Sequence, residues 1–134
     1  MKNIIFSLSL LSCSFLSAQS GRIEHLDAMA FDAKMKHIRH TLLDLRNAED
    51  FEHACIQGAI NLSWPGKEAE TYIKTLKKFE PVYIYSNDTS TPNQLGRYLI
   101  DNQFSNAVIL DKGFKAWTDL GLKVVKPEKK MPLD

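Results

Sequence analysis

Short apolar runs alternate with helical patterns along most of this chain, and that alternation limits the folds open to it. Four runs are predicted to be strands, at 41–45, 59–62, 82–86 and 107–111, and a fifth, 22–26, is predicted to be an edge strand. Between them, apolar residues recur at the three- and four-residue spacing of helices. Strands separated by helices build βαβ units, whose neighbouring strands run parallel. The sequence therefore predicts an α/β fold with a mainly parallel sheet.

Two helices are predicted to begin at a side-chain cap. Asp27 and Asn47 are residue types whose side chains accept a hydrogen bond from the first helical turn. Asn47 would open a short helix over 47–54. The helix after Asp27 would bury an apolar face made of Ala28, Phe31, Met35 and Ile38.

Three further helices are expected. One covers 68–79, with lysines on its solvated face and an apolar stripe made of Tyr72, Leu76 and Phe79. The next covers 91–102, with Pro92 in its first turn. The last, over 113–121, ends at Gly121, a residue type common at helix C-termini.

The first 18 residues differ in kind from the rest of the chain. Lys2 precedes an apolar and serine-rich run, and no acidic residue occurs before Glu24. This is the pattern of a secretory signal peptide, with cleavage expected after Ala18. An uncleaved anchor or a buried N-terminal helix is an alternative, although the run is shorter than the roughly 20 residues of a membrane span. A lipoprotein signal with Cys13 as the lipidated residue is another.

Cleavage would leave an exported protein, periplasmic or extracellular, without net charge and without a stable membrane span. The loss of Lys2 leaves 16 of the 17 basic residues to face 16 acidic ones. A basic excess is expected of proteins that bind nucleic acid or anionic membranes, so the charge argues against both. Cys55 would be the one remaining cysteine, either buried or reactive, and no internal disulfide could form. No metal or cofactor is expected.

A polar loop, SNDTST at 86–91, follows the predicted strand 82–86 and leads into a helix. Ligands of open α/β sheets bind at the carboxyl ends of the strands. That rule points to this loop and to residues 44–46, which end another strand. Amides at the start of a helix attract anions, so such a loop is a candidate binding or active site.

Two segments resemble rhodanese-like domains. LLDLRNAEDFEHACIQGAINLSW is similar to the family's Asp-x-Arg and Gly-Ala-x-Asn segment, and VILDKGFKAWTDLGLKV to its closing segment. The resemblance covers 22–126 and leaves 127–134 as a polar C-terminal tail. It implies one domain with a five-stranded, mainly parallel sheet and helices on both faces. The motif residues are Asp44, Arg46, Gly58, Gly113 and Trp117.

The resemblance also implies a chemistry that this chain departs from. In active members a cysteine opens a six-residue loop, takes a sulfane sulfur from a donor such as thiosulfate, and passes it on from a persulfide. The matching position here is Ser86, and an oxygen cannot carry a transferable sulfane sulfur in this way. Active loops often carry arginine, whereas this one has no basic residue. It reads Ser86, Asn87, Asp88, Thr89, Ser90, Thr91.

We therefore expect an exported rhodanese-like domain, inactive as a sulfurtransferase, that binds a small anion or a protein partner or acts in regulation. An alternative is a sulfurtransferase or sulfur-handling enzyme that uses Cys55, although packing would equally explain that cysteine. A third hypothesis is a hydrolase with Ser86 as nucleophile, but no histidine lies in or next to the loop in sequence.

Four other residues are expected to be structural. Asp44 and Arg46 follow the family's motif, and we expect Arg46 to pair with a carboxylate such as Glu49 or Asp50. The two tryptophans are expected in the core or at a pocket rim; they are Trp64 and Trp117.

Overall fold

The computed structural model describes residues 20–127 of this chain. The predicted signal peptide at 1–18, with Cys13, lies outside the described residues, as does the predicted tail at 127–134 apart from Pro127. Within the described range, strands and helices alternate strictly from β1 to α5. That alternation confirms the α/β class predicted from the apolar pattern.

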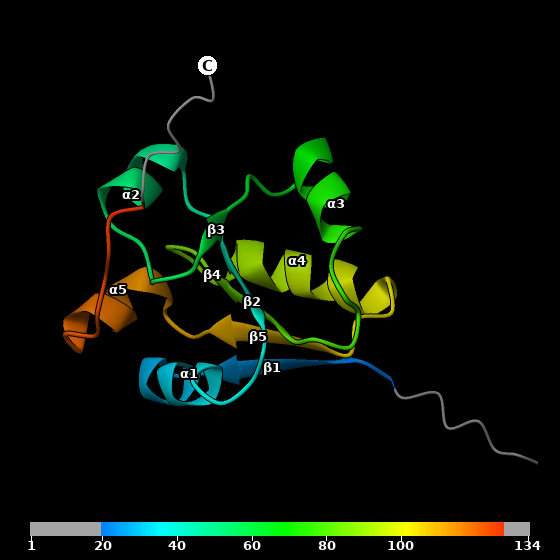
Figure 1. Ribbon diagram of the computed structural model, residues 1–134, viewed down its shortest axis with the longest axis horizontal. Coiled ribbons are helices and arrows are strands. Elements are labelled where there is room, and N and C mark those ends of the chain that lie inside the picture. The colour runs from blue at the N-terminus through cyan, green and yellow to red at the C-terminus, as the bar shows by residue number, and fades with distance from the viewer. Residues whose placement is uncertain (1–19, 128–134) are drawn as a thin grey trace, which may run out of the picture.

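The strands form a single sheet whose neighbours all run parallel. They are β1 (Arg22–Leu26), β2 (Thr41–Asp44), β3 (Ile60–Asn61), β4 (Val82–Tyr85) and β5 (Asn106–Leu110). Their order across the sheet is β1-β5-β4-β2-β3. β1 is an edge strand, as predicted, and β4 lies at the centre (Figure 1). At the other edge, the strand expected over 59–62 is reduced to two residues.

Helices cover both faces of the sheet, as the family resemblance implied. They are α1 (Ala28–Met35), α2 (Ala48–His53), α3 (Lys67–Ile73), α4 (Ser90–Asp101) and α5 (Gly113–Asp119). α1 and α5 pack on one face, and α3 and α4 pack on the other. Figure 1 shows the first pair at lower left and the second at upper right. α2 buries none of its residues in the core.

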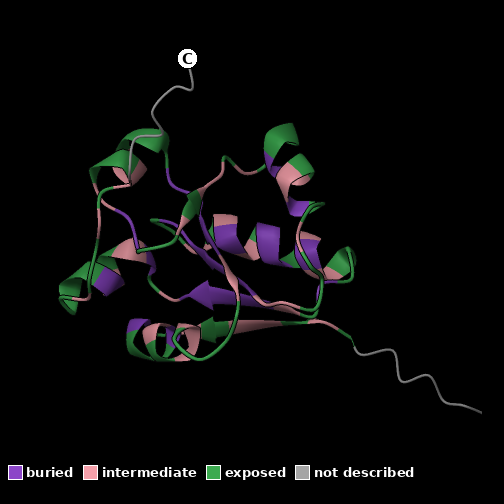
Figure 2. Ribbon diagram, in the orientation of Figure 1, coloured by how far each residue is buried: buried purple, intermediate pink, exposed green. Residues whose placement is uncertain are grey.

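The central strand β4 supplies side chains to the cores on both faces. All four of its residues are buried, and Figure 2 shows the central strands in purple. Successive side chains of a strand point to opposite faces. The cluster beneath α1 and α5 includes Phe31, Tyr83, Tyr85 and Trp117. The cluster beneath α3 and α4 includes Ile73, Val82, Ile84, Leu95 and Leu99.

The predicted caps are present. The Asp27 side chain accepts a hydrogen bond from the Ala30 amide at 2.8 Å. The Asn47 side chain accepts one from the Asp50 amide at 2.8 Å. Gly121 follows α5, and its N–H donates to a carbonyl of the last turn at 2.9 Å. The local polar chemistry of the sequence thus sets these helix ends.

The helix predicted over 68–79 is too long. α3 spans Lys67–Ile73, and Phe79 is 74% exposed rather than part of an apolar stripe. The Thr75 amide and hydroxyl both donate to the Tyr72 carbonyl, at 2.9 and 2.6 Å, which closes a tight turn and ends the helix. Ala69 and Ile73 are the buried residues of α3, and the predicted Tyr72 and Leu76 are partly buried against the same core.

The apolar face predicted for α1 is correct for its first half only. Ala28 and Phe31 are buried, and Met35 is partly buried against the same core. Ile38 lies beyond the end of the helix and is 45% exposed. Because the chain turns after Met35, the three- and four-residue spacing no longer places Ile38 on the buried face.

Candidate functional site

The polar loop predicted over 86–91 lies between β4 and α4, and its last two residues form the first turn of the helix. Ser86 follows the central strand directly and is only 5% exposed. Its hydroxyl has no hydrogen-bond partner among the described residues, and the hydroxyl oxygen is not completely buried. The Ser86 oxygen therefore keeps contact with solvent at the base of the loop.

The backbone of the loop rests on the turn between β5 and α5. The Ser86 carbonyl accepts a hydrogen bond from the Phe114 amide at 2.8 Å. A Cβ at Gly113 would lie 2.6 Å from that carbonyl oxygen and 2.9 Å from the carbonyl oxygen of Asn87. Gly113 also has a φ of +67°. The glycine implied by the family motif thus sits where no side chain fits.

Asp88 caps the start of α4. Its Oδ1 accepts a hydrogen bond from the Thr91 amide at 2.9 Å, and its Oδ2 lies 3.5 Å from the Thr91 hydroxyl. The next residue, Pro92, has no N–H to offer. The helix begins with residues 90–92. Of these, the Thr91 amide is bonded to Asp88 and Pro92 has no amide hydrogen. The chain's own carboxylate therefore occupies a position that would otherwise attract an anion.

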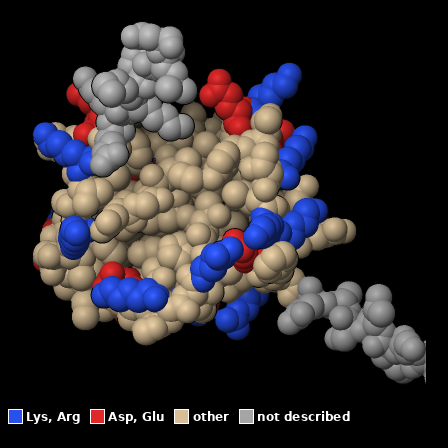
Figure 3. Space-filling model, in the orientation of Figure 1, with Lys and Arg blue, Asp and Glu red and all other residues tan. Residues whose placement is uncertain are grey.

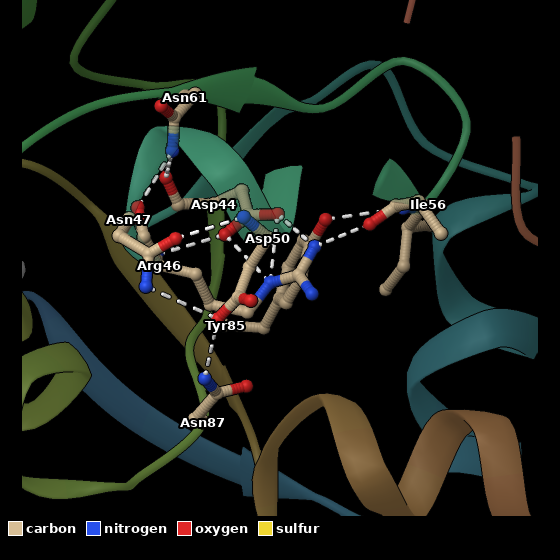
Figure 4. A network of polar contacts seen from close by, with 9 residues as sticks. Asp44, Arg46, Asn47, Asp50, Ile56, Asn61, Tyr85 and Asn87 are labelled. Atoms are coloured by element: carbon tan, nitrogen blue, oxygen red, sulfur yellow. Dashed lines mark hydrogen bonds and ion pairs between the residues drawn. The ribbon is translucent and has the colours of Figure 1, made fainter. Parts of the chain in front are cut away.

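Asn87 ties the loop to α2. Its Nδ2 donates to Oδ2 of Asp50 at 3.1 Å, and the same oxygen accepts a hydrogen bond from Nδ2 of Asn47 at 3.3 Å (Figure 4). The candidate site was expected at the carboxyl ends of the strands that are β2 and β4. These contacts join the segments that follow those two strands.

Asp44 and Arg46 form a buried ion pair at the end of β2 (Figure 4). Arg46 Nε lies 3.1 Å from each Asp44 oxygen, and Nη2 lies 2.7 Å from Oδ2. The predicted partners Glu49 and Asp50 were wrong. The guanidinium points inward, with its carbon 3.7 Å from the ring centroid of Phe114, whereas Asp50 binds the two asparagines described above.

Several groups stabilise the positive charge of Arg46. Burial by itself lowers the pKa of Arg46, but the hydrogen bond and charge of Asp44 outweigh it, and the pKa is raised. Nη2 also donates to the Ala54 carbonyl at 2.6 Å. Asn61 Nδ2 donates to the carbonyls of both ion-pair residues, at 3.0 and 2.8 Å. Asn61 was not among the predicted site residues, although it is the asparagine of the Gly-Ala-x-Asn element.

Tyr85 connects the ion pair to the segment before β3. Its hydroxyl oxygen accepts a hydrogen bond from the Ile56 amide at 3.0 Å. Burial, with the Asp44 carboxylate as a further cause, raises the pKa of Tyr85 strongly. From the sequence, Tyr85 is only a residue of the predicted strand 82–86. No local signal distinguishes it from its neighbours, because its partners come from other elements.

Cys55 is buried, 2% exposed, and free. Burial raises the pKa of its thiol, and the Asp44 charge adds to that effect. Its backbone forms an antiparallel bridge with Val125 through two hydrogen bonds of 2.8 Å. Since the thiolate is the reactive form of cysteine, these surroundings are those of a packed rather than an activated thiol.

The remaining motif residues have packing and turn positions. Gly58 lies in a turn with φ of +85°, closed by a hydrogen bond from the Ala59 amide to the Ile56 carbonyl. Trp117 is 2% exposed. Trp64 is partly buried and packs against Tyr98, with ring centroids 4.7 Å apart.

No histidine contacts Ser86 in the described part of the chain by a hydrogen bond. The histidine rings that do bond are His25, 3.3 Å from Asp111, and His40, 2.7 Å from the Ile38 carbonyl. Within residues 20–127, Ser86 therefore lacks a hydrogen-bonded histidine to serve as the base of a serine nucleophile.

The described residues show neither a metal-binding cluster nor a membrane-spanning helix. Within 20–127, no group of three or more histidine, cysteine, aspartate or glutamate residues is placed to hold a metal ion. No helix in that range has the length and apolar character needed to cross a bilayer. On the face in Figure 3, basic and acidic side chains are interspersed around an uncharged centre.

An all-parallel sheet of this order, with a polar loop leading from its central strand into a helix, defines an open α/β protein, and the candidate site lies at the carboxyl edge of the sheet. The family model for the rhodanese-like domain matches residues 26–120, most of the chain. The chain belongs to the rhodanese-like domain family, which is related to sulfurtransferases.

Solved structures of rhodanese-like proteins share the fold. A rhodanese-like domain of an Anabaena protein is 20% identical, with a TM-score of 0.67 over 82% of this chain and 85% of that one. A rhodanese-related protein of Thermoplasma volcanium is 17% identical, with a TM-score of 0.66 over 78% and 99%. A thiosulfate sulfurtransferase of Pseudomonas aeruginosa is 15% identical, with a TM-score of 0.64 over 82% of this chain and 21% of that one. At these identities the likeness concerns the fold alone.

Proposed function

We propose that this chain is an exported rhodanese-like domain that does not transfer sulfane sulfur and serves as a binding or regulatory module. The observation that carries the proposal is the residue at the base of the loop. Ser86 directly follows the central strand, where active relatives place their cysteine, and its oxygen cannot form a persulfide. The surrounding fold is retained, so the loop remains available to bind a ligand or partner.

The state of Cys55 supports the same proposal. A displaced sulfur carrier would need an accessible thiol with a lowered pKa. Cys55 is 2% exposed, and burial raises its pKa. A hydrolase that uses Ser86 would need a base beside the hydroxyl, and the histidine hydrogen bonds lie elsewhere.

Intact-mass spectrometry of the mature protein, incubated with thiosulfate, tests the loss of sulfur transfer. We expect no gain of about 32 Da, the mass of one persulfide sulfur. A matched Cys55→Ala variant assigns any gain that occurs. A gain in the wild type that disappears in Cys55→Ala would overturn the proposal and identify Cys55 as a sulfur carrier.

Export has a separate test. Expression in a Gram-negative host, followed by N-terminal sequencing of the processed protein, should give Gln19 as the first residue, because the signal pattern places cleavage after Ala18. Recovery of the unprocessed chain in the cytoplasm would contradict export without bearing on the loop.

A further inference from the structure

We propose that Asp88 makes the loop between β4 and α4 select against anionic ligands, so that the group bound next to Ser86 carries no negative charge. This inference rests on the proposed function, because it names the ligand class of the same loop. It departs from the anionic sulfur donors that the loop of active relatives accepts.

The first observation is the contact that Asp88 makes. Its carboxylate receives the Thr91 amide at 2.9 Å, and Pro92 has no amide. The start of a helix offers an anion partial positive charge and free N–H groups. Here the Asp88 carboxylate offsets that charge and takes one of the two N–H groups at 90–92, so an incoming anion would meet a like charge.

A second carboxylate contacts the loop. Asp50 of α2 accepts the Asn87 side chain at 3.1 Å. One carboxylate, Asp88, thus belongs to the loop itself, and the other, Asp50, contacts it from α2. Their charges add at the loop.

The cations near the loop do not offset these carboxylates. Arg46 is buried, and its charge is paired with Asp44 at 2.7 Å. Lys112, in the turn that touches the loop backbone, is exposed and forms no ion pair with Asp50 or Asp88 within the described residues.

The group left to meet a ligand is the Ser86 hydroxyl. The residue is 5% exposed and its oxygen has no partner among the described residues, yet the oxygen is not fully enclosed. A hydroxyl both donates and accepts hydrogen bonds. It therefore suits an uncharged polar group, such as an amide or a hydroxyl, beside the two carboxylates.

Charge selection at the loop can be measured with a thiol at position 86. In a Ser86→Cys variant, the thiolate sulfur attacks the CH₂ carbon of iodoacetamide or iodoacetate, a C–S bond forms, and iodide leaves with the electron pair of the C–I bond. The two reagents have similar sizes but differ by one negative charge. Their rate ratio reports the local charge, because a change in the thiol pKa affects both rates equally. The wild type, with Cys55 as its one mature thiol, is the blank.

We expect Ser86→Cys to favour iodoacetamide over iodoacetate, and Asp88→Asn in that background to reduce the preference about threefold. That factor is the effect of one unit charge at roughly 6 Å in water. Asparagine caps a helix as well as aspartate does, so the substitution removes the charge and keeps the cap. Asp101→Asn, at the far end of α4, is the matched control and should leave the ratio unchanged.

An unchanged ratio in the Ser86→Cys/Asp88→Asn variant would overturn the proposal. A second measurement needs no cysteine at position 86. In ¹H–¹⁵N spectra, sodium sulfate, compared with sodium chloride of equal ionic strength, should shift the Ser90 and Thr91 amides of Asp88→Asn but not those of the wild type. Equal shifts in both proteins would overturn the proposal even if the cysteine variant failed to fold. Neither result depends on whether the wild type transfers sulfur.

Discussion

Gly113 belongs to the closing segment of the family's sequence pattern and Ser86 to its loop, and the structure places one against the other. The α5 helix begins at Gly113, where a Cβ would lie 2.6 Å from the Ser86 carbonyl oxygen. The position of the site loop therefore depends on the absence of a side chain in a different βα turn.

Substitution of Gly113 tests that dependence. We expect Gly113→Ala to lower the free energy of unfolding by more than the roughly 1–2 kcal/mol of a left-handed alanine, because its Cβ would lie 2.6 Å from the Ser86 carbonyl oxygen. Gly58→Ala is the matched control, since Gly58 has a φ of +85° but no atom near its missing Cβ. Urea unfolding of both variants measures the difference, and equal losses would contradict the close contact.

The ion pair of Asp44 and Arg46 gives a second single-residue prediction. Removing one member of a buried pair leaves the other charge uncompensated, at a cost of about 3–5 kcal/mol. We expect Arg46→Met to be destabilised by that amount and Asp44→Leu/Arg46→Met to recover part of the loss. Thermal or urea unfolding checks both variants. A double variant no more stable than the single one would show that the polar network, rather than charge pairing, holds the β2 end.

Among the elements, α2 depends on polar contacts more than any other helix. It buries no residue, and its contacts include the Asn47 cap, the Arg46 bond to Ala54 and the Asn87 bond to Asp50. Elements with few buried apolar contacts open locally at low free energy. The helix beside the candidate site is therefore the element most sensitive to surface substitutions.

Hydrogen exchange can test the link between the loop and α2. We expect Asn87→Ala to speed amide exchange in α2 while exchange in β4 and β5 stays unchanged, because only the loop-to-helix contact is lost. Asn102→Ala is the matched control, since it removes an exposed asparagine bond at the end of α4. Equal acceleration of α2 in both variants would refute the link.

The sequence predicts a feature of these elements correctly when the residues that determine it lie close together along the chain. The Asp27 and Asn47 caps and the Gly121 helix end were correct because each involves residues a few positions apart. α3 was overextended because its apolar spacing continues past the turn made by Thr75. The partner of Arg46 was wrong because the choice between Asp44 and Asp50 depends on which way the guanidinium points, and Phe114 of a distant helix decides that.

For the whole molecule, two buried groups that lose a proton at alkaline pH should make the free energy of unfolding fall as the pH rises. Burial raises the pKa of Tyr85 above its ordinary value of 10.0 and that of Cys55 above 9.0. Above those values the unfolded chain loses these protons first. The stability that these groups contribute is therefore complete below about pH 9 and is lost as pH rises through the folded pKa values.

Urea unfolding at a series of pH values tests this dependence. We expect the free energy of unfolding to fall above pH 10, by about 1.4 kcal/mol per pH unit for each proton that only the folded chain retains. Tyr85→Phe should show a shallower fall with pH, because it lacks the phenol proton. The variant also removes the acceptor of the Ile56 amide, which lowers stability at every pH. The fall is therefore measured relative to each protein's own free energy of unfolding at pH 7. Identical slopes in wild type and variant would contradict the assignment to Tyr85.

If the protein is exported as proposed, the bridge between Cys55 and Val125 bears on its oxidation. Two backbone hydrogen bonds hold the end of the described chain beside Cys55, the one thiol within residues 20–127. In an oxidising compartment, an uncovered thiol would join two molecules through a disulfide. We expect residues 124–127 to help cover this thiol and so to hinder covalent dimers. A chain that stops at Lys123 should accumulate them in air, visible on a non-reducing gel, while the full chain stays monomeric on the same gel.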